Sequence, residues 1–181
     1  MTYSPLIVIF VFLFGGNAQP NTLNDKENIS EIIYKQNTKN IGPVYIGMTG
    51  AQIEELGLPY TITTENMEGD EYTIYLVNLS DSAILKCIFD LDGHLSIIST
   101  SSQTVTDKFG NGAGSTVQDL HESYPNGRFI YGSAEGSYVV YTTGSMLRFR
   151  FDYKDMPESC FETGGKCNVP IDIRVKKFEI R

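Results

Sequence analysis

Apolar and polar residues alternate along most of the chain after residue 40, with the two-residue period of strands that bury one face. β-Branched and aromatic side chains occupy many of the apolar positions, as strands favour. Two short segments interrupt this period with helical spacing, one beginning at Thr49 and one at Thr116. The pattern therefore predicts an α+β fold, a mostly antiparallel β-sheet with two short helices. The clearest strand signals lie at residues 60–64, 71–77, 83–90, 95–99, 128–131, 137–142 and 146–152.

Both helices carry start and stop signals. Thr49 caps the first helix, with Gln52 at the third helical position to complete a capping box, and Gly57 ends it. Thr116 begins the second helix, which closes at Tyr124 before a proline. Helices of about two turns are not stable alone, so both must be held by packing on the sheet.

The chain repeats itself. Gly47-Met48-Thr49 recurs 67 residues later as Gly114-Ser115-Thr116. The strand at 84–90 recurs 62 residues later at 146–152, with inward apolar positions, outward basic positions and a terminal Asp. This similarity predicts a tandem duplicated unit, a short helix packed on antiparallel strands. We expect one domain over residues 41–181, made of two repeats at 41–100 and 109–181.

The turn at Asp92-Gly93 closes a hairpin in the first repeat. A plain two-residue turn would set Phe89 against a serine. One bulged residue, with Gly93 in the left-handed region, instead pairs Phe89 with Leu95 and Cys87 with Ile97. The bulged hairpin is favoured because it keeps apolar residues opposite apolar ones.

The second repeat is enlarged before its last strand. That strand is expected at 171–180, where a change of parity predicts a bulge at Lys176-Lys177. The insertion at 153–170 carries Cys160 and Cys167 on either side of a flexible turn. In an oxidising compartment the two are expected to form a disulfide, and closing so small a loop contributes roughly 2.5 kcal/mol in the chain-entropy model.

The first 40 residues precede the predicted domain. Residues 1–18 have the pattern of a signal peptide, with an apolar run over 6–14 and small residues before a cut after Ala18. An uncleaved anchor is the alternative, and membrane attachment is expected only in that case. Residues 19–40 are rich in polar side chains and predict a disordered lead with one short helical turn around 29–34. The chain is therefore expected in the periplasm or outside the cell.

Charge narrows the classes of partner. The chain has 22 acidic and 14 basic residues, a formal charge of −8 at pH 7 and a pI near 4.7. Such a charge repels nucleic acid and anionic membrane surfaces and attracts cationic molecules. We expect a protein partner, with a cationic one favoured, and no nucleic-acid binding.

No arrangement of reactive residues points to catalysis, so we expect a non-enzyme without cofactor or metal. His94 and His121 are the only histidines, and neither has a second ligand at metal-binding spacing. Asp90-Leu91-Asp92-Gly93 is open to a calcium-loop or a hairpin-turn interpretation, and the turn is favoured. The glycine-rich stretch 110–116 is open to a phosphate-loop or a strand-to-helix interpretation, and again the turn is favoured. Cys87 lies on the inward face of a strand, which favours a buried, inert thiol.

One loop is a candidate binding site. Between Gly132 and Tyr138, small residues surround one carboxylate and one aromatic ring, an arrangement suited to insertion into a partner's cleft. An ordinary hairpin connection remains the alternative. The candidate binding residues are Ser133, Glu135, Ser137 and Tyr138.

The Gly-Met-Thr opening at 47–49, the Leu-Gly-Leu-Pro close at 56–59 and the second copy at 114–120 resemble segments of secreted or lipid-anchored bacterial proteins. Over residues 41–180 they are similar to the small outer-membrane assembly lipoproteins of the SmpA/OmlA type. The resemblance implies a secreted or periplasmic, non-catalytic accessory domain of the cell envelope that binds another protein.

A second function stays open. Glu135-Gly136-Ser137-Tyr138 resembles the Ser-Gly-x-Tyr loop of periplasmic lysozyme inhibitors, with Glu135 in place of the serine. This resemblance implies an inhibitor of a cationic lysozyme-type hydrolase that acts through the 132–138 loop. The acidic charge would steer the chain toward such basic enzymes.

Overall fold

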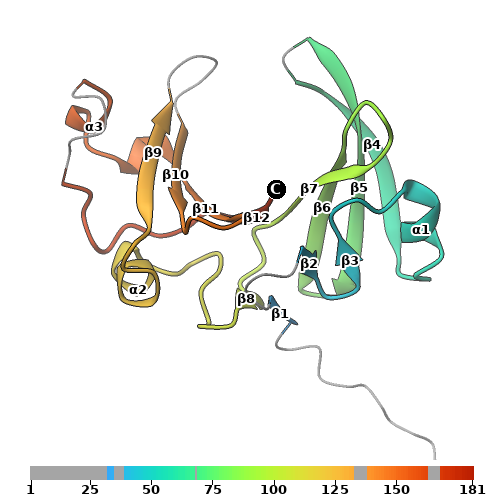
Figure 1. Ribbon diagram of the computed structural model, residues 1–181, viewed down its shortest axis with the longest axis horizontal. Helices are drawn as coiled ribbons and strands as arrows, with labels where there is room; N and C mark the ends of the chain where they lie inside the picture. Colours follow the sequence, from blue (N-terminus) through green and yellow to red (C-terminus); the bar gives the residue numbers. More distant parts are fainter. Residues whose placement is uncertain (1–31, 35–38, 68, 133–137, 163–167) are drawn as a thin grey trace, which may run out of the picture.

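The computed structural model describes residues 32–34, 39–67, 69–132, 138–162 and 168–181 (Figure 1). The strands are β1 (Ile32–Tyr34), β2 (Asn40–Ile41), β3 (Val44–Tyr45), β4 (Tyr60–Met67), β5 (Asp70–Ser80), β6 (Ala83–Phe89), β7 (Leu95–Thr100), β8 (Val105–Asp107), β9 (Arg128–Gly132), β10 (Tyr138–Thr142), β11 (Leu147–Phe151) and β12 (Lys177–Ile180). The helices are α1 (Gly50–Glu54), α2 (Val117–Ser123) and α3 (Ser159–Glu162), with a 3-10 turn η1 (Tyr153–Asp155).

One eight-stranded sheet organises the protein. Its strand order is β4-β5-β6-β7-β12-β11-β10-β9, and every neighbouring pair is antiparallel. Strands β4 to β7 form one meander and β9 to β12 another, and the two join where β7 pairs with β12. The predicted α+β class, with a mostly antiparallel sheet, is confirmed. The insertion adds a third short helix, α3, that the sequence pattern did not predict.

The helices all pack on one face of this sheet, where the main core lies. Alternate strand residues point to that side, as the two-residue period predicted, and they meet Ile53 of α1 and Val117 and Leu120 of α2. Strands β2, β3 and β8 add Ile41, Val44 and Val105 to the same core. Figure 1 shows α1 and α3 at the two outer flanks, with β7 and β12 meeting in the middle near the C-terminus.

Helices α1 and α2 begin in the same way. Thr49 and Thr116 both cap with φ −88° and ψ 164°, and each forms a complete capping box. The box predicted at Gln52 is confirmed, and Asp119 plays the same part in α2. Because the Thr116 backbone N–H and hydroxyl both donate to the Asp119 carboxylate, the pKa of that group lies below its usual value.

The segment 171–180, which was expected to form one strand, departs from the prediction. Only Lys177–Ile180 joins the sheet, whereas a strand was expected from Ile171. The Ile171 and Ile173 carbonyls instead accept the Gln118 and Val117 N–H groups at 3.0 Å each. The first turn of a helix has N–H groups without partners of its own, and this segment satisfies two of them.

The bulged hairpin was predicted correctly at its turn. Beyond the turn, the predicted strand pairing is shifted by one residue. Gly93 has φ 78° and Phe89 pairs with Leu95, as predicted. Cys87, however, pairs with Ile98 and not with Ile97. Ser96 is the unpaired extra residue, and its hydroxyl donates to the Ile88 carbonyl at 3.1 Å. Leu95 and Ile98 can therefore both face the core.

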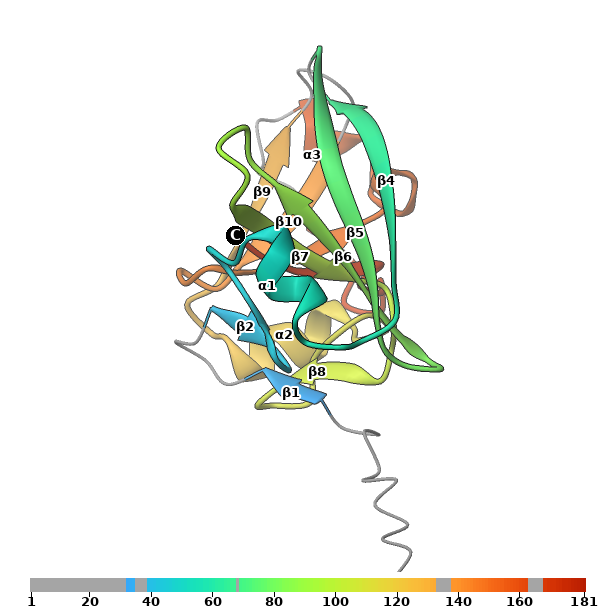
Figure 2. The ribbon, with the colours of Figure 1, turned by 90° about the vertical axis from the view of Figure 1, so that its right-hand side faces the viewer.

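The predicted helical turn in the lead is wrong where the structure describes it. Residues 32–34 form β1, which pairs in parallel with β8 (Figure 2). Two isoleucines and a tyrosine favour a strand, and β8 offers them backbone hydrogen bonds that a single isolated helical turn lacks. The predicted signal peptide at 1–18 and the rest of the disordered lead up to residue 38 lie outside the described residues.

The cysteines fall into two environments. Cys87 is free and fully buried, and burial raises the pKa of its thiol to about 12, as expected for an inert side chain. Cys160 is disulfide-bonded and buried in the core as part of α3, where Phe161 meets the Tyr131 ring edge-on at 6.3 Å. Its predicted partner Cys167 lies outside the described residues, so that pairing stays a prediction.

Candidate functional site

The second face of the eight-stranded sheet is not covered by any helix of the described residues, and we call it the open face. In Figure 1 the two halves of the sheet rise on either side of β7 and β12, with the helices outside them. On this face, residues that pair with each other from strand to strand form a continuous row across all eight strands. That row is Thr61, Leu76, Lys86, Ser99, Glu179, Arg148, Thr142 and Arg128.

A second row on the open face runs through the half formed by β9 to β12. Lys177 pairs with Arg150, Arg150 with Val140, and Val140 with Ile130. Val140 is 4% exposed, whereas Ile130 is 39% exposed at the sheet edge. The face thus combines charged groups near its middle with an apolar flank.

A buried carboxylate anchors the middle of the open face. Glu179 is 2% exposed and lies opposite Ser99 where the two meanders join. The Arg150 Nε lies 2.8 Å from one of its oxygens, and the Arg181 Nε donates to the other at 3.0 Å. Both oxygens of this carboxylate therefore lie beside guanidinium groups, and a buried charge needs such partners.

Two lysines flank this pair. The Lys86 ammonium group donates to both Glu65 oxygens at 2.6 and 2.7 Å. Lys177 forms no salt bridge with another described residue. Burial lowers the pKa of the Lys177 amine, and repulsion from Lys86 and Arg150 lowers it further, against smaller opposing effects of the two glutamates.

The sequence contained part of this signal. Basic residues at outward positions were visible in the two similar segments, Lys86 in 84–90 and Arg150 in 146–152. Their meeting with Lys177 and Glu179 was not, because it depends on how β6, β7, β12 and β11 pair.

Of the candidate residues in the 132–138 loop, the structure describes only Tyr138. Ser133, Glu135 and Ser137 lie outside the described residues. The Tyr138 ring lies across Gly132, where a Cβ atom would come within 2.0 Å of it, and it is 42% exposed. The Arg150 guanidinium carbon is 6.0 Å from the ring centroid. Tyr138 therefore belongs to the edge of the open face.

The inhibitor hypothesis is tested by the turbidity of a cell-wall suspension treated with a basic lysozyme. If the 132–138 loop inhibits, the wild type slows clearing and Tyr138→Ala abolishes about 90% or more of that effect, because aromatic anchors dominate such interfaces. Tyr153→Ala is the control, since Tyr153 is similarly exposed at 45% outside the loop. Unchanged clearing with the wild type eliminates this function.

The acidic turn and the second histidine, which the sequence offered as candidates for metal binding or catalysis, have structural roles. The carboxylate of Asp90 accepts the His94 and Asp92 N–H groups at 2.8 and 3.1 Å, which makes Asp90 to Gly93 a hairpin turn. His121 meets the Tyr141 ring edge-on at 5.4 Å. No group of three or more His, Cys, Asp or Glu side chains suited to a metal occurs among the described residues.

The glycine-rich stretch 110–116 makes a strand-to-helix turn. The Gly114 N–H donates to the Val175 carbonyl at 2.8 Å, and Gly112 donates to the Ser115 hydroxyl at 3.0 Å. The Thr116 N–H donates to Asp119 at 2.7 Å. Donors that a phosphate would need are thus committed to protein acceptors.

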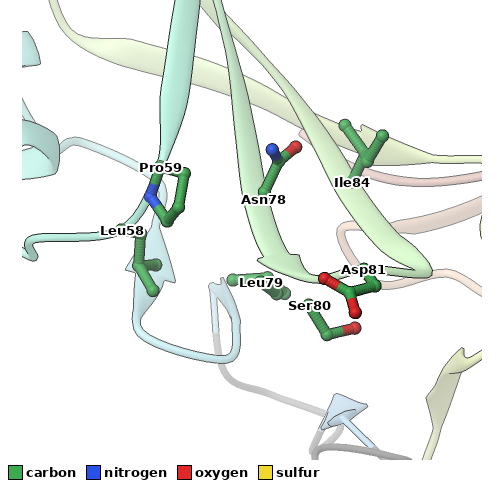
Figure 3. A pocket seen from close by; sticks show the side chains of 7 residues that line it. All are labelled: Leu58, Pro59, Asn78, Leu79, Ser80, Asp81 and Ile84. Atoms are coloured by element: carbon green, nitrogen blue, oxygen red, sulfur yellow. The ribbon is translucent and has the colours of Figure 1, made fainter.

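A surface hollow of about 410 Å³ lies at the far end of β5 and β6 (Figure 3). Asp81 is its one ionisable side chain, and Asn78 and Ile84 face the hollow from the two strands. It has no base or second carboxylate to work with Asp81. We assign it no chemistry. Its lining is completed by Leu58, Pro59, Leu79 and Ser80.

Comparisons with known proteins bear on the fold alone. No protein-family model matches the chain, and no curated protein matches it significantly. Within the described residues no helix has the length and apolar character to cross a membrane. Among solved structures, the crystal structure of the uncharacterized protein yfeY from Escherichia coli is similar, with a TM-score of 0.50 and 15% identity over 82% of this chain and 99% of that one. The chain therefore shares its overall fold with yfeY.

Proposed function

We propose that the chain is a secreted or periplasmic, non-catalytic accessory domain of the cell envelope that binds another protein through the open face. The observation that carries this proposal is the sheet face itself. It spans eight strands and has no helix of the described residues over it. Its exposed apolar edge at Ile130 and Tyr138, beside a centre of charged groups, is the composition of protein-binding surfaces.

We further propose that the domain arose by tandem duplication. The identical caps at Thr49 and Thr116 support this origin. So do two matching bridges, Thr49 with His94 and Thr116 with Arg174. Duplication doubles a four-stranded meander into one wide face.

The envelope location rests on the signal-peptide pattern and on the resemblance to SmpA/OmlA-type lipoproteins. A disulfide at Cys160 fits an oxidising compartment. The similarity to yfeY concerns the fold and does not indicate a binding partner.

Site-specific photo-crosslinking in the cells that make the protein tests this function. A benzophenone side chain at Ile130, 39% exposed on the open face, is expected to give one discrete covalent adduct on illumination. The matched control is Ile171, an isoleucine 60% exposed away from the sheet. Equal adducts at both positions, or none at Ile130, would count against the open face as a binding surface.

A further inference from the structure

The open face carries positive charge in an acidic protein. Its strand residues include five cations and three carboxylates, whereas the whole chain has a formal charge of −8. The fold has therefore gathered basic side chains on the side that no described helix covers. The cations are Lys86, Arg128, Arg148, Arg150 and Lys177, and the carboxylates are Glu65, Asp70 and Glu179.

Internal pairing uses only part of this charge. Glu65 compensates Lys86, and Glu179 compensates Arg150. Lys177 has no salt bridge with a described residue, although it is half-buried and lies among like charges. A cation held in this way gains more from an incoming anion than a fully solvated one does, because its own water shell is already incomplete.

The apolar flank adds a second requirement on the ligand. Lys177, Arg150, Val140 and Ile130 occupy one straight row over four adjacent strands. Three strand spacings measure roughly 14 Å, the length of about four extended residues. A ligand lying along this row meets positive charge at one end and an exposed isoleucine at the other.

We propose that the open face binds an acidic peptide segment of a partner protein, with a carboxylate beside Lys177 and Lys86 and an apolar side chain about four residues away over Ile130. This proposal rests on the proposed use of the face for protein binding. It reverses the expectation of a cationic partner, because the open face carries a net positive charge whereas the whole chain carries a net negative charge.

A membrane or a free phosphate is a poorer occupant. The Lys86 and Arg150 side chains are only 26% and 33% exposed, so they are recessed from any flat surface. The net charge of −8 repels an anionic bilayer as a whole. An extended peptide can enter where a bilayer cannot, and its apolar residue also uses Ile130.

Selection of random peptides displayed on phage against the purified full chain tests the proposal. The expected binders carry Asp or Glu with an apolar residue about four positions away. Their synthetic copies should lose about tenfold or more in affinity for Lys177→Glu, because the new carboxylate repels the ligand's own. The control is Lys176→Glu, the same charge change one residue earlier, where the ammonium group faces Asp155 at 3.2 Å.

The outcomes separate the two proposals. Binders that lack carboxylates, or that bind Lys177→Glu and wild type equally, overturn the acidic-segment proposal. If the affinity of such binders still falls with Ile130→Ala, the open face remains a protein-binding surface. If their affinity is unchanged by Ile130→Ala as well, the proposed function fails too. Binding to phosphatidylglycerol vesicles that Lys177→Glu abolishes overturns the proposal in favour of a membrane. Should Lys177→Glu not fold by circular dichroism, Lys177→Gln is measured in its place, with the same ranking expected.

Discussion

Phe178→Ala is expected to lower the free energy of unfolding by about 3–5 kcal/mol, a large part of the stability of an ordinary domain. Phe178 is fully buried in β12, the strand that joins the two meanders. Its ring lies 5.6 Å from the Phe149 ring, in the core under the sheet. Truncation removes the transfer free energy of the ring and leaves a cavity that two neighbouring strands hold open.

Urea unfolding followed by circular dichroism measures this loss. Ile171→Ala is the matched control, because Ile171 is 60% exposed and outside the sheet, and it should change stability by no more than about 0.5 kcal/mol. Equal midpoints for the two variants would show that the join of the two meanders contributes little to stability.

Asp107→Ala is expected to cost about 3 kcal/mol, through lost hydrogen bonds and not through a cavity. The Asp107 carboxylate is 1% exposed at the end of β8. One oxygen accepts the Phe109 and Asn111 N–H groups at 2.8 and 2.9 Å, and the other accepts the Tyr124 hydroxyl. Alanine leaves the two backbone N–H groups without this acceptor and detaches the loop that follows β8 from Tyr124 at the end of α2.

The same unfolding assay with Asp81→Ala provides the control, since Asp81 is exposed and both substitutions remove one carboxylate charge. Asp107→Asn should fall between the wild type and Asp107→Ala, because the amide oxygen can still accept the two N–H groups while its nitrogen cannot accept the tyrosine hydroxyl. If Asp107→Ala is as stable as Asp81→Ala, the carboxylate does not hold this loop.

Local features were predictable wherever a few neighbouring residues decide the structure. The caps at Thr49 and Thr116 depend on side chains within three residues of the cap, and both form as capping boxes. The turn at Gly93 depends on a glycine that tolerates a positive φ. The inward and outward faces follow from strict alternation along each strand that has no bulge.

Predictions failed where a distant segment offered better partners. Residues 171–175 read as strand, but the open N–H groups of α2 draw the Ile171 and Ile173 carbonyls away from the sheet. Residues 32–34 read as part of a lead with a helical turn, but β8 supplies a parallel partner. Cys87 pairs with Ile98 and not with the predicted Ile97, because Ser96 is the bulged residue.

The sequence by itself determined the class of fold, the helix starts and the face on which most strand residues lie, because these depend on short-range backbone geometry and on the two-residue period. Tertiary structure alone decided that β7 pairs with β12. That pairing between the meanders makes one wide sheet and brings Lys86, Lys177 and Arg150 around Glu179. Pairing between strands about 80 residues apart leaves no local pattern, since it is set by which surfaces bury the most apolar area together.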